Sequence, residues 1–198
     1  MSTTTLQAEP QPQEVVSFIH MADGTKEDYE LLARLEETFN RSLPDRLLNA
    51  LDALKHSLSG YKVSRYEHSM QAATHAYNNG ESEEMIVAAL LHDIGDELAP
   101  HTHGEMVAAI FKPYMSEKTC WIIKHHGLFQ LYYYGHLVGG DRHARDRYKD
   151  HPYYQATVDF CEKYDQNCFD PDFESLPIEV FEPMVHRVFL QEPHFVEE

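Results

Sequence analysis

Apolar residues recur at spacings of three and four along most of this chain, and no long stretch alternates with a period of two. The first spacing places apolar side chains on one face of a helix, whereas the second would indicate a strand. The pattern therefore predicts an all-α domain. The expected helices cover residues 26–39, 42–58, 66–77, 84–93, 102–113, 116–127, 152–165 and 178–190.

Glycine, proline and capping residues mark several of the expected helix ends. Gly95 is expected to let the backbone leave the helix that ends at His92 and Asp93, and Gly127 is expected to end the helix that precedes it. Thr102 and Glu105 fit the capping-box pattern, which would place His103 in the first turn of a helix. Pro183 is expected to kink or restart the last helix.

The length and composition indicate one globular domain. A chain of 198 residues can bury one substantial core, and its first 14 residues are polar with two prolines. We therefore expect a flexible tail over residues 1–14 and a single domain over residues 15–198. The three cysteines are too few and too scattered for a disulfide framework, so a reducing, cytoplasmic location is expected.

The charge and the apolar pattern exclude some partners. A net charge of −17 argues against nucleic acid and anionic membranes, because both need a basic surface. The chain has no apolar run near 18 residues and no secretory signal pattern, so no membrane span is expected. A small anionic substrate remains compatible with this charge, and the oligomeric state is left open.

Histidines and aspartates lie within or beside apolar helices, where polar groups are costly to bury. Ligands of this kind, without thiolates, suit iron, manganese or zinc. Their number is too large for one ion with an open position, so we expect two ions with Asp93 shared between them. The candidate ligands are His68, His92, Asp93, His103, His125, His126 and Asp165.

Two of these assignments have simpler alternatives. His125 and His126 could instead stabilise a helix C-terminus, where positive charge is favoured. Asp165 could be a solvated acid at a helix end.

The order His68, His92-Asp93, Asp165 resembles the metal-binding motif of the HD-domain superfamily, whose members are helical. The stretch YEHSMQAA resembles the first-ligand motif of its mixed-valent diiron oxygenases, and similarity continues in LLHDIGDELAP, IIKHHGLFQLYYY and FCEKYDQNCFDP. The resemblance covers about residues 59–165. It implies one HD-type helical bundle with a dinuclear metal site at its centre.

The resemblance also implies the ligand set and the cofactors. One iron would be held by His68, His92, Asp93 and Asp165. The other would be held by Asp93, His103 and one of His125 and His126, with the spacing to Gly127 slightly favouring His126. The pair would be Fe(II)/Fe(III) with dioxygen as co-substrate, and no catalytic residue is expected beyond the ligands.

The implied reaction is oxidative cleavage of a carbon–phosphorus bond in a small zwitterionic phosphonate. The expected substrate is (R)-1-hydroxy-2-(trimethylammonio)ethylphosphonate, with glycine betaine and phosphate as products. The chain departs from the aminophosphonate branch of the family at two positions. Asp96 stands in place of a histidine and Tyr61 in place of a glutamate, and the second change favours a quaternary ammonium held by aromatic faces.

Aromatic side chains for the ammonium group and cations for the phosphonate lie near the expected ligands. Aromatic residues here could equally be core, and residues 142–147 could form a solvated loop. The candidates for substrate contact are Tyr61, Arg65, Asp96, Phe129, Tyr133, Arg142, His143 and Arg145.

Two alternative functions fit the same residues. The ligands on zinc, manganese or magnesium could activate water, which would make the protein a phosphohydrolase acting on a small phosphate ester or nucleotide. A closed coordination sphere would instead indicate a non-catalytic sensor with a structural metal.

Overall fold

The computed structural model of the chain describes residues 14–194, so the expected tail lies outside this part except for Glu14. Every regular element within residues 14–194 is helical, which confirms the all-α prediction. The α-helices are α1 (Lys26–Arg41), α2 (Leu43–Ala53), α3 (Arg65–Asn78), α4 (Glu83–Leu91), α5 (His103–Phe111), α6 (Glu117–Tyr134), α7 (Tyr154–Tyr164) and α8 (Ile178–Phe189); the short 3-10 helices are η1 (Met21–Asp23), η2 (Leu54–His56), η3 (Gly135–Leu137) and η4 (Ala144–Tyr148).

The chain divides into two compact units, one ending at Ser42 and one beginning at Leu43. In the first unit, Thr25 and Asp28 form a capping box at the start of α1. The main-chain N–H of Ser17 also donates to the Asp28 carboxylate over 2.7 Å. The expectation of a single domain over residues 15–198 stays a prediction.

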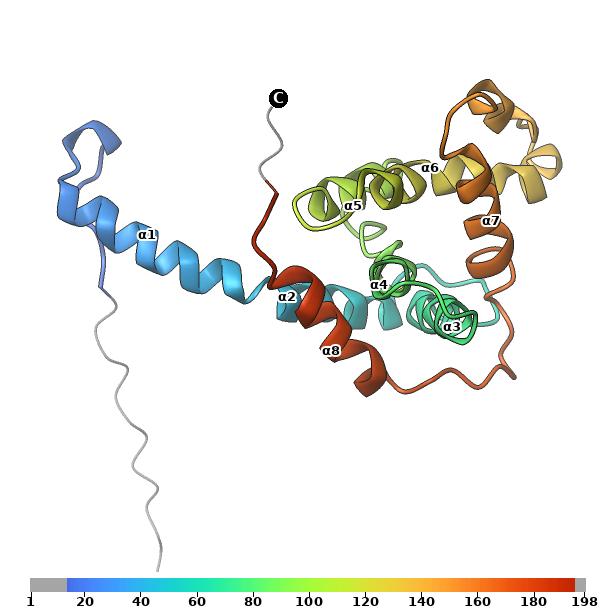
Figure 1. Cartoon of the computed structure of the whole chain (residues 1–198), viewed down its shortest axis with the longest axis horizontal. Helices are drawn as coiled ribbons and strands as arrows, with labels where there is room; N and C mark the ends of the chain where they lie inside the picture. Colours follow the sequence, from blue (N-terminus) through green and yellow to red (C-terminus); the bar gives the residue numbers. More distant parts are fainter. Residues whose placement is uncertain (1–13, 195–198) are drawn as a thin grey trace, which may run out of the picture. The chain divides into compact units, whose positions relative to one another are not determined.

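The second unit is built around α4. All seven residues of the stretch 85–91 are buried, because α3 packs along one side of α4 and α6 and α8 contact it elsewhere (Figure 1). Complete burial of a leucine such as Leu90 contributes about 1.5–3 kcal/mol. Helices α5, α6 and α7 pack successively against one another. His92 and Asp93 therefore directly follow a helix, α4, that is packed into the core.

The expected helix stop at Gly127 is wrong, and packing explains why, whereas α4 does end before Gly95. Helix α6 continues through Gly127 to Tyr134, since Phe129 in its second half is fully buried. Gly95 lies in the turn after α4 without a positive φ. A Cβ there would lie 2.9 Å from the main-chain oxygen of His103. The glycine thus allows α5 to begin close to the His92-Asp93 turn.

Two other local predictions are also corrected. The Thr102 side chain makes no capping hydrogen bond, although α5 does begin at His103. Helix α8 runs without a break from Ile178 to Phe189, so Pro183 does not restart it, and the kink stays a prediction.

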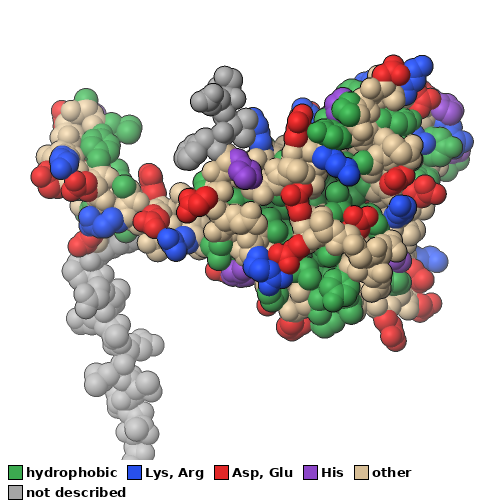
Figure 2. Space-filling view, in the orientation of Figure 1, with side chains coloured by type: hydrophobic (Ala, Val, Ile, Leu, Met, Phe, Trp, Pro, Cys, Tyr) green, Lys and Arg blue, Asp and Glu red, His purple; other side chains and the backbone are tan. Residues whose placement is uncertain are grey.

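No helix within residues 14–194 is both long enough and apolar enough to cross a membrane. On the face of the molecule drawn in Figure 2, acidic and basic side chains are interspersed. The cysteines at positions 120, 161 and 168 are all free thiols.

Candidate metal centre

Six of the seven candidate ligands converge at one place in the second unit. They come from the ends or middles of five helices, and only His103 among them is not fully buried. His68 lies on α3, His92 and Asp93 directly follow α4, His103 begins α5, His126 lies within α6, and Asp165 directly follows α7.

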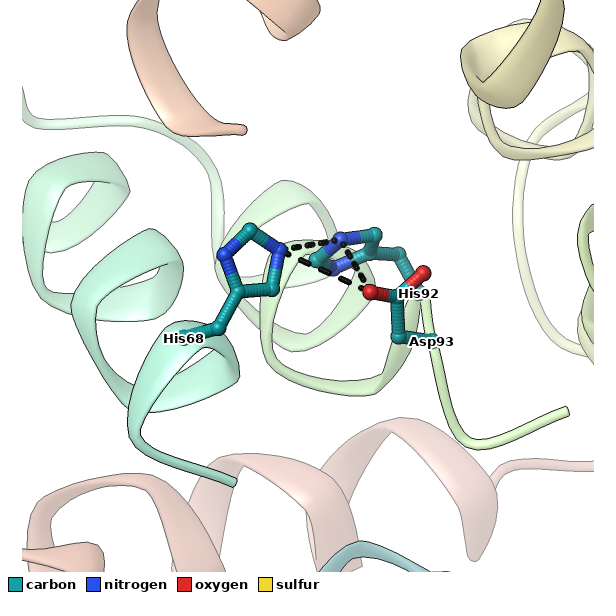
Figure 3. A group of neighbouring side chains, drawn as sticks. All are labelled: His68, His92 and Asp93. Atoms are coloured by element: carbon teal, nitrogen blue, oxygen red, sulfur yellow. Dashed lines mark hydrogen bonds and ion pairs between the residues drawn. The ribbon is translucent and has the colours of Figure 1, made fainter. Parts of the chain in front are cut away.

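Four of these side chains form a first group, part of which is drawn in Figure 3. The Nε2 atoms of His68 and His92 lie 3.1 Å apart, and each lies 3.5 Å from Oδ2 of Asp93. Asp165 completes the group, with Oδ1 at 3.3 Å from the His68 Nε2 atom and 3.7 Å from that of His92.

The other oxygen of Asp93 faces a second group. Its Oδ1 lies 3.5 Å from Nε2 of His103 and 3.4 Å from Nε2 of His126, and these two nitrogens lie 3.0 Å apart. Asp93 therefore presents one oxygen to each group, which is the arrangement that a carboxylate shared by two metal ions requires.

These separations match the spacing of ligand atoms around a metal ion. With bonds of about 2.1 Å, neighbouring ligands lie about 3.0 Å apart in an octahedron and about 3.4 Å apart in a tetrahedron. Neither oxygen of Asp165 has a hydrogen-bond partner, although the residue is fully buried. A buried carboxylate without such partners is costly, and a cation would compensate it. The donor set could hold a dinuclear metal site.

Main-chain oxygens orient three of the imidazoles. The Nδ1 atoms of His68, His92 and His126 lie 3.0, 2.7 and 2.6 Å from the carbonyl oxygens of Cys168, Ala89 and Ile123, respectively. Because a carbonyl can only accept, each Nδ1 carries the proton and each Nε2 presents a lone pair to the centre.

Arg65 and Asp96 border the two groups. The Arg65 guanidinium donates to Oδ2 of Asp93 over 2.9 Å and to Oδ2 of Asp96 over 3.0 Å. Burial opposes the charge of Arg65, but the two carboxylates outweigh it and raise the pKa of the guanidinium. The second oxygen of Asp96 lies 3.2 Å from Nδ1 of His103.

The imidazoles and carboxylates perturb one another strongly. Burial favours the neutral acid of Asp93, yet interactions with His92, His126, His68 and Arg65 lower its pKa well below the usual range. His68 and His92 likewise outweigh burial and lower the pKa of Asp165. Strong mutual perturbation of this kind is typical of functional sites.

His125 lies outside this cluster. Its ring stacks on Trp121 with the centroids 4.2 Å apart, and Trp121 stacks on His151 on its other face at 4.1 Å. Burial and the neighbouring cations lower the pKa of His125 to about 4. The structure thus brings His126, and not His125, to the carboxylates, because successive residues of α6 point about 100° apart.

The aromatic candidates for substrate contact fall into two environments. Tyr61 is half exposed and stacks on Phe169, which stacks in turn on the ring of His68. Phe129 is fully buried against Trp121, and Tyr133 packs at the edge of the core. Phe129 therefore has no exposed face to offer a ligand.

The basic candidates other than Arg65 lie around η4. The guanidinium groups of Arg142 and Arg145 lie 4.5 and 3.7 Å from the centroid of the Tyr132 ring. Arg145 is nine-tenths buried and two of its nitrogens lack hydrogen-bond partners. His143 is exposed and lies 3.5 Å from a carboxylate oxygen of Asp146.

Sequence reasoning missed Phe169 and the cavity beside His103. Phe169 follows Asp165 by four residues, so an aromatic residue close after the last ligand was the available signal. The cavity has a volume of about 510 Å³ and is lined by His103, Lys124, Gly127, Tyr134 and Arg147, among others. Because His103 lines it, the cavity borders the second group.

Two comparisons with known proteins bear on this site. Residues 65–156 match the family model for the HD domain. A 1-hydroxy-2-(trimethylamino)ethylphosphonate dioxygenase (glycine-betaine-forming) from Leisingera caerulea is 58% identical over 36 residues. This match spans 18% of the chain and 18% of the relative, so it covers less than a fifth of the relative's length.

The HD match contains five of the six converging ligands, and Asp165 lies nine residues beyond its end. The segment over residues 65–156 is therefore similar to the HD domain, and its histidines and Asp93, together with Asp165, form a cluster able to hold a dinuclear metal site.

Proposed function

We propose that this protein holds two iron ions and uses dioxygen to cleave the carbon–phosphorus bond of a small hydroxyphosphonate. The proposed substrate is (R)-1-hydroxy-2-(trimethylammonio)ethylphosphonate, and the products are glycine betaine and phosphate. The observation that carries the proposal is the position of Asp93 between two imidazole groups, since each of its oxygens faces a different pair of histidines. The short likeness to the dioxygenase supports the choice of substrate.

The proposed reaction balances with dioxygen alone. The hydroxyphosphonate dianion and O2 become a carboxylate, hydrogen phosphate and one proton. The carbon–phosphorus and carbon–hydrogen bonds break, the carbon is oxidised and dioxygen is reduced. Each product contains one oxygen atom more than the corresponding part of the substrate. A bound iron pair would supply dioxygen activation and electron transfer, which amino-acid side chains do not provide.

The protein's own residues would bind and orient the two ions and the substrate. His68, His92 and Asp165 would hold one ion, and His103 and His126 the other, with Asp93 shared. The Nδ1–H hydrogen bonds of His68, His92 and His126 keep the Nε2 atom of each ring free to bind an ion.

The half-exposed ring of Tyr61, next to the first group, suits a trimethylammonium group. Tyr61, Phe169 and His68 form a continuous stack with centroid separations of 4.9 and 4.5 Å. A quaternary ammonium donates no hydrogen bond and is attracted to ring faces by about 0.5–2 kcal/mol. The guanidinium of Arg65 already lies 5.3 Å from the Tyr61 centroid, so this ring can accept a cation.

The cavity beside His103 is a route for the anionic end of the substrate. Lys124 and Arg147 line it, and its volume of about 510 Å³ lies within the usual range for a small-molecule site. Lys124 is partly neutralised by Glu105 at 4.0 Å, which leaves Arg147 as the stronger anion partner.

The test is an isotope experiment on protein loaded with iron under argon. Given ¹⁸O2 and the R substrate, the oxygenase should place one labelled oxygen in glycine betaine and one in phosphate, with one O2 consumed per phosphate. The S form and the primary-amine analogue serve as comparisons. Asp93→Asn should abolish turnover, whereas Asp159→Asn, outside the cluster, should retain it.

A phosphohydrolase is the alternative, because the same donors suit other divalent ions as well. It would release phosphate from phosphate esters under argon, with oxygen from labelled water in the phosphate. That result, together with no O2 uptake, would refute the oxygenase.

A further inference from the structure

The four imidazoles of the centre are not oriented in the same way. His68, His92 and His126 are held by main-chain carbonyl oxygens. His103 instead faces a charged side chain, with its Nδ1 atom 3.2 Å from Oδ1 of Asp96. A carboxylate accepts a stronger hydrogen bond from Nδ1–H than a neutral carbonyl does. The ring then has more electron density on Nε2 for a metal ion.

Both oxygens of Asp96 already contact protein groups. Its Oδ1 faces His103, and its Oδ2 accepts from Nη2 of Arg65 over 3.0 Å. The carboxylate and the guanidinium are 13% and 16% exposed, so solvent screens this pair only partly. Arg65 spans from Asp96 to Asp93, which ties the orientation of the carboxylate behind His103 to that of the shared carboxylate.

The turn after α4 makes this contact possible. Asp96 lies three residues beyond Asp93, and its N–H bonds to the Asp93 carbonyl oxygen over 3.0 Å. Gly95 allows the main chain of His103 to approach, because a Cβ at that position would clash with it. The first residue of α5 is thereby held against the Asp96 side chain.

We propose that Asp96 is a positioning residue that acts through His103 and strengthens the metal position formed by Asp93, His103 and His126 more than it strengthens the other position. The inference rests on the proposed metal centre but not on its reaction. In this proposal the Asp96 side chain orients the His103 imidazole and does not bind the substrate.

The proposal predicts unequal loss of metal when Asp96 is changed. Supports of this kind typically contribute about 10–100-fold in metal affinity. In Asp96→Ala, one Mn(II) should bind nearly as tightly as in the wild type and the second about 10–100-fold more weakly. The electron paramagnetic resonance signal of a coupled Mn(II) pair should be replaced by that of single ions.

Two further variants separate positioning from a general structural effect. Asp96→Asn retains an acceptor oxygen without the charge, so its second affinity should lie between those of Asp96→Ala and the wild type. Glu97→Gln removes the adjacent exposed carboxylate and should bind both ions normally. In ¹⁵N spectra of the metal-free protein, His103 should show a single tautomer with the proton on Nδ1. A mixture of tautomers should appear only in the Asp96 variants.

The outcomes are distinct. Two Mn(II) bound with wild-type affinities by Asp96→Ala, or equal weakening of both positions, would overturn the role of Asp96. Failure of the wild type to bind two ions would refute the metal centre itself. Because neither dioxygen nor phosphonate is used, the result does not depend on whether the protein is an oxygenase or a hydrolase.

Discussion

The rings of His68 and His92 meet with their Nε2 atoms 3.1 Å apart, although the residues are 24 positions apart in the chain. Each ring donates its Nδ1–H to a main-chain carbonyl, so two nitrogen lone pairs face each other. Such a contact is repulsive unless a cation or a shared proton lies between the rings. Two buried carboxylates beside it favour the cation.

Metal binding should therefore stabilise the folded protein. An ion that binds only the folded state at 100 times its dissociation constant adds about 2.7 kcal/mol to the free energy of unfolding. Removal of metal by a chelator should lower Tm, and Fe(II) added under argon should restore it, as measured by differential scanning calorimetry. In Asp93→Asn this metal dependence should largely disappear, and an equal response in that variant would contradict the cluster as the binding site.

His125 and His126 should respond differently to substitution. His126→Ala should remove one metal ion per chain, because its Nε2 faces Asp93 at 3.4 Å. His125→Ala should retain both ions but lose about 0.5–1.5 kcal/mol of aromatic stacking on Trp121. Trp121 is the only tryptophan, so its fluorescence reports on this stack directly. Loss of metal from His125→Ala together with normal metal content in His126→Ala would reverse the assignment.

Two glycines near the centre should differ in the sign of their effect on stability. In Gly104→Ala the new Cβ would lie 2.7 Å from the main-chain oxygen of Ile123, so we expect a loss of about 1–3 kcal/mol. In Gly127→Ala the nearest atom is in the His103 ring at 3.7 Å, an ordinary contact. Because Gly127 lies inside α6, alanine should add about 0.5–1 kcal/mol there. Urea unfolding would measure both, and the same sign for both would refute the packing argument.

The first unit should lose stability in acid through Asp28. The main-chain N–H groups of Ser17 and Thr25 donate to its carboxylate and hold its pKa at about 2, below the ordinary value of 3.8. A lowered pKa means that the ionised form stabilises the fold above about pH 4 and that this contribution is lost as the pH falls towards 2. Carboxyl NMR titration of the whole chain should show the midpoint near 2, with the Ser17 amide following it.

The control for that titration is substitution on the same helix. Asp28→Asn should remove the acid-dependent change in hydrogen exchange at the start of α1. Glu30→Gln, an exposed partner of Lys26, should leave it in place. A midpoint for Asp28 close to 4 would show that the capping box does not form.

Periodicity alone determined the helical class and most of the helices of this protein. The stretch EMIVAALL predicts a helix buried on every side, and residues 85–91 are all buried. Ligand types and their order in the sequence also indicated a metal site, because histidine and aspartate beside apolar helices need a partner. These are local properties, so the sequence contains them directly.

Tertiary packing decided what local patterns could not. Gly127 resembles a helix stop, but the burial of Phe129 keeps α6 helical beyond it. The choice between His125 and His126 depends on which face of α6 meets Asp93, and a shift of one residue turns a side chain by about 100°. Asp96 and Phe169 acquire their roles from rings on other elements, those of His103 and His68. Such contacts join residues distant in sequence, and only the packing of the helices brings them together.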